Sequence, residues 1–133
     1  MSYVTAIVLA AGRGLRLKSK ITKPLLKINS KPLMFYCLDV FSKHPKIRDI
    51  IIVVNSENLK SIIGKIRQYK IRKVKDVVLG RKLRQGSVVN GLKRINNQTD
   101  LVLIHDAVRP FIDKSIVSSA IKEAEKTGAA IVG

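Results

Sequence analysis

Two glycines and two basic residues follow the first apolar segment of the chain. The segment YVTAIVL (3–9) leads into AAGRG (10–14), with Arg16 and Lys23 shortly after it. Small residues let backbone N–H groups approach an anion closely, because no Cβ stands in the way. Such a loop is as often a plain turn, but the added arginine and lysine favour a phosphate site. The spacing fits neither a GxGxxG fingerprint nor a P-loop.

A second stretch with binding chemistry leads into a predicted helix. Its sequence is GRKLRQGS (80–87), and the helix is expected to begin near residue 84. Gln85 and Ser87 can hydrogen-bond a base or a ribose, and the N-terminus of a helix favours anions. Ordinary capping of the helix by Ser87 accounts for the same residues equally well. The sequence leaves both interpretations open.

A third stretch, IHDAVRP (104–110), supplies a candidate metal ligand. Asp106 can hold Mg²⁺ against phosphate oxygens, since hard cations take carboxylate ligands. His105 can serve as a general base, although a histidine at the end of a strand is more often a structural hydrogen-bond donor. Arg109 can pair with Asp106 or bind phosphate, and the sequence favours neither role.

Alternating strands and helices must position these three stretches. Periodicity predicts strands at 3–9, 48–54, 74–80, 101–105 and 129–132, and helices at 32–43, 57–68, 84–96 and 113–127. This alternation predicts an α/β fold, a Rossmann-like three-layer sandwich with a mostly parallel central sheet. Ligands of such folds bind beyond the carboxyl ends of the strands. The three stretches follow three of the predicted strands, so we expect them to meet at that edge.

Local signals add detail to the predicted helices. Residues 10–30 are expected to form a loop, and Ser30 is expected to cap the helix at 32–43. That helix should stop before Pro45. The inner side of the helix at 84–96 is expected to carry four apolar residues, Val88, Val89, Leu92 and Ile95.

Length and composition limit the class of protein. The 133 residues suit a single domain (1–133), and 46% of them are hydrophobic, which argues against disorder. The only cysteine, Cys37, lies in an apolar helical pattern and is expected to be a buried thiol rather than a nucleophile. With two histidines and one cysteine, a zinc site is not expected. No segment approaches the length of a membrane span, so a cytoplasmic protein is expected.

Basic residues far outnumber acidic ones. The chain has 26 Lys and Arg against 9 Asp and Glu, a formal net charge of +17, which suggests a polyanionic partner. From Lys60 to Arg84, Asp76 is the single acid among many basic residues. A nucleic-acid-binding module would use such a stripe for phosphate contacts. Because the stripe has neither a recognition-helix signature nor clustered aromatic residues, binding of nucleic acid is not the favoured hypothesis.

Four motifs occur together in a fixed order and spacing. They are AAGxGxR (10–16), a lysine seven residues beyond that arginine, RQGSVVNGL (84–92) and HDAVRPF (105–111). Together they resemble the 2-C-methyl-D-erythritol 4-phosphate cytidylyltransferase family. The resemblance spans essentially all 133 residues but only the first part of the family's chain. We therefore expect the nucleotidyltransferase type of the α/β fold, apparently truncated at the C-terminus.

The resemblance implies transfer of CMP from CTP to 2-C-methyl-D-erythritol 4-phosphate, with Mg²⁺ as cofactor. Arg16 and Lys23 match the pair that stabilises the pentacoordinate α-phosphorus, and Asp106 matches a position beside the metal. Seven further residues match nucleotide-binding positions: Ala10, Ala11, Gly12 and Gly14 around the triphosphate, Gly80 and Ser87 at the cytosine, and Ala107 beside the ribose.

The acceptor and the assembly depend on the rest of the family's chain. The acceptor-binding residues and the arm that forms a homodimer are expected beyond Gly133. For that reason another polyol phosphate, such as ribitol 5-phosphate, is the alternative acceptor within the same enzyme class.

Overall fold

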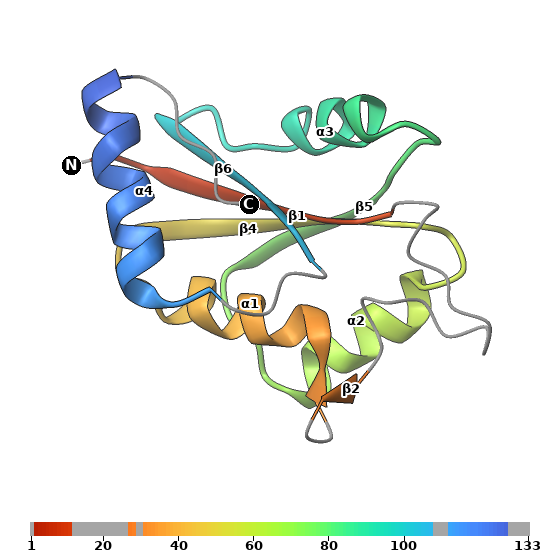
Figure 1. The fold of residues 1–133 in the computed structure, drawn as a ribbon. Helices are drawn as coiled ribbons and strands as arrows, with labels where there is room; N and C mark the ends of the chain where they lie inside the picture. The colour runs from red at the N-terminus through yellow and green to blue at the C-terminus, as the bar shows by residue number, and fades with distance from the viewer. Residues whose placement is uncertain (1, 12–26, 29–30, 108–111, 128–133) are drawn as a thin grey trace.

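Strands and helices alternate along the chain in the computed structural model, which describes residues 2–11, 27–28, 31–107 and 112–127 (Figure 1). In chain order the elements are β1 (Val4–Ala10), β2 (Lys27–Ile28), β3 (Lys31–Pro32), α1 (Leu33–Lys43), β4 (Ile47–Val54), α2 (Leu59–Gln68), β5 (Val74–Leu79), α3 (Arg84–Leu92), β6 (Leu101–Asp106) and α4 (Lys114–Thr127). The predicted helices and the first four predicted strands are confirmed, with small shifts at their ends. The predicted strand at 129–132 lies outside the described residues.

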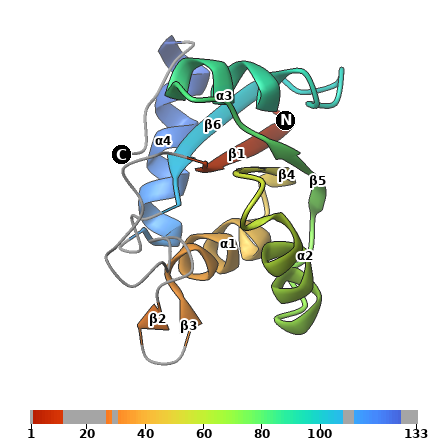
Figure 2. The same ribbon diagram turned by 90° about the vertical axis from the view of Figure 1, so that its right-hand side faces the viewer.

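The main sheet is parallel throughout its described strands. Its order is β5-β4-β1-β6, with β1 paired to β4 on one side and to β6 on the other. Helices α1 and α2 cover one face and α3 covers the opposite face, as the turned view shows (Figure 2). The predicted three-layer α/β arrangement is therefore confirmed.

Strand β1 alternates between the two layers of the core. Val4, Ala6 and Val8 belong to the large apolar cluster formed with α1, α2 and α4, whereas Ile7 and Leu9 belong to the smaller cluster beneath α3. All seven residues of β1 are buried, as expected for a parallel strand that is covered on both faces. Burial on both faces fixes the register of β1 and therefore the place where its C-terminal loop begins.

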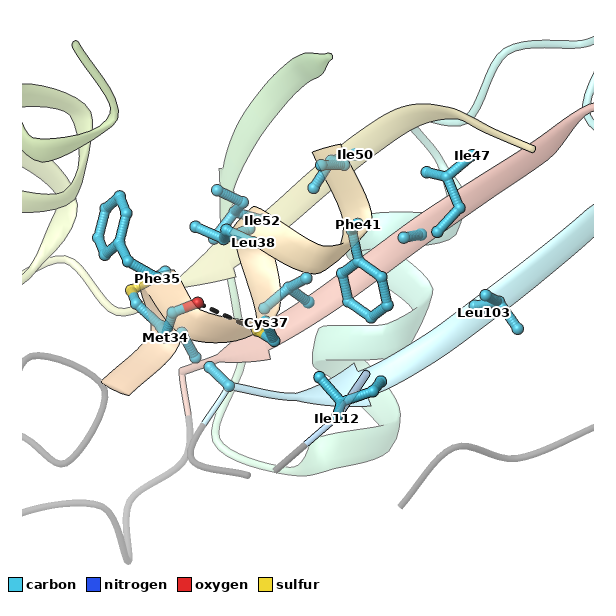
Figure 3. Close-up of a cluster of buried hydrophobic side chains, with 14 of the residues drawn as sticks. Met34, Phe35, Cys37, Leu38, Phe41, Ile47, Ile50, Ile52, Leu103 and Ile112 are labelled. Carbon is cyan, nitrogen blue, oxygen red and sulfur yellow. Dashed lines mark hydrogen bonds between the residues drawn. The ribbon is translucent and has the colours of Figure 1, made fainter. Parts of the chain in front are cut away.

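Helix α1 supplies the aromatic part of the large cluster. Phe35 and Phe41 are fully buried and belong to this cluster, which Figure 3 shows in close-up. Cys37 lies between them, its thiol donates to the carbonyl of Met34 at 3.1 Å, and burial raises the pKa of the thiol to about 12. The expectation of a buried, unreactive thiol is therefore confirmed.

The start of α1 differs from the prediction. The N-cap residue is Pro32, with no side-chain capping hydrogen bond, and the predicted cap, Ser30, lies outside the described residues. A short antiparallel ladder between β2 and β3 lies within and just after the stretch predicted as a loop. Two-residue strands are too short to show any periodicity. The helix ends at Lys43, before Pro45, as predicted.

Helix α3 is shorter than predicted and is turned differently. It ends at Leu92, and the side chains of Val89 and Leu92 are 44% and 39% exposed, so their predicted inward position is wrong. The face that meets the sheet carries small residues, because a Cβ on Gly91 would lie 3.0 Å from Cγ2 of Ile7. Val88 and Ile95 do pack on the cluster beneath α3, as predicted.

Candidate functional site

Three strands of the sheet end at the same level. Ala10 of β1 is in register with Val54 of β4, which is in register with Leu79 of β5. The chain continues this alignment beyond β5, because the N–H of Gly80 donates to the carbonyl of Val54 at 2.8 Å. The register therefore places Ala11, Asn55 and Gly80 at one edge of the sheet, where parallel α/β folds bind their ligands.

The fourth strand of the sheet reaches the same edge from the opposite side of β1. Asp106, the last residue of β6, is in register with Leu9, and the N–H of Ala107 donates to the carbonyl of Leu9 at 2.9 Å. Ala107 is fully buried, and Asp106 is partly exposed. The predicted stretches after β1, β5 and β6 therefore meet at one edge, as expected.

Gly80 is in close contact with both Ala11 and Ser87. A Cβ built on Gly80 would lie 2.5 Å from Cβ of Ala11 and 2.6 Å from Oγ of Ser87. Real Cβ atoms essentially never approach other heavy atoms so closely. Only glycine fits here without displacement of its neighbours. Three residues that the sequence analysis selected from two separate stretches of the chain thus form one contact.

The hydroxyl of Ser87 holds the loop between β5 and α3. Its Oγ accepts the N–H of Arg81 at 3.0 Å and donates to the carbonyl of the same residue at 3.2 Å. Helix α3 has Leu83 at its N-cap, with no side-chain capping hydrogen bond, so the capping interpretation of Ser87 is wrong. Because the single hydroxyl proton of Ser87 is used within the loop, its direct role is to fix the path of residues 80–87.

A cavity of about 270 Å³ lies beside this contact. Its lining comes from the ends of β1, β4 and β5 and consists of Ala11, Asn55, Ser56, Leu79, Gly80, Arg81 and Lys82. The two cations favour an anionic ligand, and the small residues allow it to approach the backbone. The sequence analysis missed Asn55 and Ser56, which belong to none of its motifs. Their position directly after a predicted buried strand was the signal that could have found them.

Asp106 faces the first residue of α3, Arg84. Nε of Arg84 lies 3.6 Å from Oδ1 of Asp106, and both side chains are partly exposed. Water screens such an ion pair, which makes the carboxylate exchangeable between partners. The described residues contain no group of three or more His, Cys, Asp or Glu arranged to hold a metal ion. A single carboxylate still suits Mg²⁺, which is commonly held by one or two carboxylates together with substrate phosphates.

His105 lies in the core and not in the cavity lining. Its side chain is 1% exposed, and its ring meets Phe41 edge-on, with centroids 5.5 Å apart. Of the two roles left open by the sequence, the structural one fits this burial. The predicted residues Gly12, Gly14, Arg16, Lys23 and Arg109 lie outside the described residues.

Comparison with known proteins matches nearly the whole chain to a single family. Residues 4–133 match the 2-C-methyl-D-erythritol 4-phosphate cytidylyltransferase family. The enzyme of that name from Clostridium botulinum (strain Loch Maree / Type A3) is 41% identical over 133 residues, which are 100% of this chain and 58% of the relative. The corresponding enzyme from Clostridium acetobutylicum is 43% identical over 129 residues, 96% of this chain and 56% of the relative.

A solved structure extends the comparison to the fold. The crystal structure of 4-diphosphocytidyl-2C-methyl-D-erythritol synthase from Anaerococcus prevotii superimposes with a TM-score of 0.79 and 29% sequence identity. The superposition covers 94% of this chain and 52% of that protein. The chain thus spans somewhat more than half the length of these relatives. Among the described residues, no helix has the length and apolarity to cross a membrane.

Proposed function

Because the chain belongs to the 2-C-methyl-D-erythritol 4-phosphate cytidylyltransferase family, we propose that it forms the nucleotide-binding part of an enzyme that transfers CMP from CTP to 2-C-methyl-D-erythritol 4-phosphate. The observation that carries the proposal is the contact of Ala11, Gly80 and Ser87 beside a cavity at the strand ends. These residues come from two motifs far apart in the sequence, and the fold brings them together. Residues 1–133 are then one nucleotide-binding domain.

The proposed reaction forms one P–O bond and breaks another. A phosphate oxygen of the acceptor attacks the α-phosphorus of CTP, and the bond from that phosphorus to the bridging oxygen breaks. Pyrophosphate leaves with the electron pair of the broken bond. Such an in-line transfer depends more on stabilisation of negative charge than on acid–base groups.

Nine residues of this chain are proposed to act directly on the nucleotide, in addition to a cation ligand. Arg16 and Lys23 stabilise charge on the α-phosphorus, and both follow Ala11, which lines the cavity. The backbone of Ala10, Ala11, Gly12 and Gly14 binds the triphosphate. Gly80 and Ser87 shape the base pocket, and Ala107 lies beside the ribose.

Asp106 is proposed to hold a divalent cation, with Mg²⁺ as the expected ion. Its carboxylate is partly exposed at the end of β6, and its pairing with Arg84 at 3.6 Å is loose enough to exchange. When bound, the cation would neutralise charge on the phosphate oxygens. Arg84 and Asp106 would then separate, leaving Arg84 available to the nucleotide.

A pyrophosphate-release assay tests this function. CTP is offered with 2-C-methyl-D-erythritol 4-phosphate and, separately, with ribitol 5-phosphate, to this chain and to a longer protein that contains it. We expect the longer protein to turn over the first acceptor, and its Arg16→Ala variant to lose about 10²-fold in kcat, as for one removed oxyanion-type donor. If the longer protein prefers ribitol 5-phosphate, the proposed acceptor is wrong but the proposed enzyme class stands. If the longer protein releases pyrophosphate with neither of the two acceptors, the proposal is refuted.

Two further proposals concern the assembly of the enzyme and its location in the cell. We propose that the complete enzyme is a homodimer whose further residues bind the acceptor, and that it works in the cytoplasm. Size-exclusion chromatography with light scattering of the longer protein tests the first point. Fractionation of cells that produce it tests the second.

A further inference from the structure

Asn55 occupies a central place at the proposed base pocket. It follows directly after β4, which lies between β5 and β1 in the sheet, so Gly80 and Ala11 come from the strands on its two sides. Its side chain is half-buried and lines the cavity of about 270 Å³ together with both of those residues. A ligand that fills this cavity therefore comes close to Asn55.

The orientation of the Asn55 amide is fixed by the start of α2. The N–H of Asn58 donates to Oδ1 of Asn55 at 3.0 Å and to its backbone carbonyl at 3.2 Å. Only the carbonyl oxygen of an amide accepts a hydrogen bond, so the NH₂ group must lie on the other side of the side chain. That group makes no hydrogen bond with any residue in the described part of the chain. Asn55, which lines the cavity, thus keeps both NH₂ donors uncommitted within the described residues while its acceptor is already engaged.

Ser87 does not offer the cavity a comparable donor. Its hydroxyl proton is donated to the carbonyl of Arg81 at 3.2 Å, and breaking that bond would release the loop that shapes the pocket. The other polar side chains that line the cavity, Ser56, Arg81 and Lys82, are all exposed. Among the described residues that line the cavity, Asn55 is therefore the one side-chain donor that is half-buried rather than exposed.

A donor placed at N3 distinguishes cytosine from uracil, although both bases carry acceptor oxygens. Cytosine carries the acceptor atoms N3 and O2 on its pairing edge, whereas N3 of uracil carries a proton. We propose that Asn55 determines base specificity by donating a hydrogen bond from its NH₂ group to N3 of cytosine. This inference rests on the proposed binding of CTP. A pocket that hydrogen-bonds one base disfavours the other, because mismatched polar groups are left unpaired on burial.

Asn55→Asp tests the proposal with the smallest change of shape. Aspartate keeps the oxygen that accepts the N–H of Asn58 and replaces the NH₂ donor by an acceptor. Affinities for CTP and UTP are measured by isothermal titration calorimetry on the whole chain at several salt concentrations. The added negative charge repels both triphosphates alike, so the ratio of the two affinities isolates the base. We expect the preference for CTP to fall about tenfold or more, the effect of losing one buried hydrogen bond worth roughly 1.4 kcal/mol.

Two further variants make the result specific. Asn97→Asp introduces the same charge at an exposed asparagine beyond α3 and should leave the preference unchanged. Asn55→Ala removes the donor without adding charge, and it should bind CTP no better than 3-deaza-CTP, which lacks the N3 acceptor. The wild type should favour CTP over that analogue. Thermal melting of each variant shows whether it is folded.

The outcomes separate this inference from the proposed function. If the wild type binds CTP in preference to UTP and both folded Asn55 variants keep that preference, the inference about Asn55 is wrong and the proposed function stands. If the wild type shows no preference for CTP, the proposed nucleotide specificity fails, and the inference fails with it.

Discussion

The two ends of the sheet are built differently. At the amino ends of the strands, Tyr3 donates its hydroxyl to Oδ2 of Asp49 at 2.6 Å and accepts from Nδ2 of Asn96 at 3.2 Å. Its backbone N–H donates to Asp100 at 2.7 Å. At the carboxyl ends, Ala11 and Gly80 line a cavity together with Asn55, Arg81 and Lys82. There, Ser87 bonds only within its own loop in the part of the chain described.

This difference separates stability from binding. Side chains at the amino ends join β1, β4 and the segment before β6, which are far apart in the sequence, and so they hold the sheet together. Small residues at the carboxyl ends leave backbone groups accessible to a ligand. Changes at the two ends should therefore have different consequences, which three predictions make measurable.

Gly80→Ala should have the largest effect. The new Cβ would lie 2.5 Å from Cβ of Ala11 and 2.6 Å from Oγ of Ser87, so the loop must move. We expect a loss of about 1–3 kcal/mol in the free energy of unfolding, typical of overpacking. Affinity for CTP should also fall by about tenfold or more. Urea denaturation and calorimetric titration measure the two quantities.

Gly64→Ala is the matched control for that substitution. Gly64 lies inside α2, and a Cβ there would meet nothing within 4 Å. The control should stabilise the protein by about 0.5–1 kcal/mol, because alanine favours the helix. Equal losses of stability in the two variants would contradict the close contact at Gly80.

Tyr3→Phe should lower stability without changing nucleotide binding. The variant removes the donor to Asp49 and the acceptor for Asn96, and it leaves the ring in place. The hydrogen bond to Asp49 is also the main reason that the pKa of Tyr3 is raised. We expect a loss of about 1–2 kcal/mol in the free energy of unfolding, since a partly buried carboxylate loses its partner. Calorimetry should give an unchanged affinity for CTP.

Tyr69→Phe provides the comparison for this effect. The Tyr69 ring packs against Phe35 with centroids 5.1 Å apart, and its hydroxyl makes no hydrogen bond with the described residues. Its removal should change stability little. A weaker affinity for CTP in Tyr3→Phe would show that the two ends of the sheet are coupled after all.

Much of this arrangement was predictable from the sequence, for a physical reason. Buried parallel strands read as continuous apolar runs, so their carboxyl ends, and the residues Ala11, Gly80 and Asp106 at or just beyond them, could be placed on one edge. The contact between Gly80 and Ser87 fits the prediction that both belong to one site. The alternation of elements predicted a parallel sheet, but the strand order β5-β4-β1-β6 was not predicted from it.

Other features could not be predicted because they depend on tertiary contacts. Asn55 has no motif of its own, and its importance comes from the position of β4 between two other strands. Helical periodicity placed Val89 and Leu92 inward, but close packing at Gly91 turns a face of small residues towards the sheet. The pairing of Arg84 with Asp106 joins two motifs whose distance in space is set by the fold.

The smallest expected effect concerns His44, which joins helices near the amino ends of the strands. Its Nδ1 accepts the N–H of Lys46 at 3.1 Å, so the neutral ring must carry its proton on Nε2, which lies 2.8 Å from Oγ of Ser118. Burial lowers the pKa of His44, and Lys114, Lys73 and Lys46 lower it further. The folded protein therefore resists protonation of this ring.

The sign of the pH dependence follows from that shift. In the unfolded chain His44 takes up a proton as the pH falls through its ordinary value of about 6.5, while in the folded protein it stays neutral to lower pH. Its stabilising contribution is complete above that value and declines below it, by at most about 1.4 kcal/mol per pH unit. Urea denaturation at pH 7.5 and 5.5 should therefore show a larger loss of stability in the wild type than in His44→Gln, which cannot titrate. An equal loss in both proteins would assign the pH dependence to other groups and would remove His44 from the interactions that hold this end of the sheet.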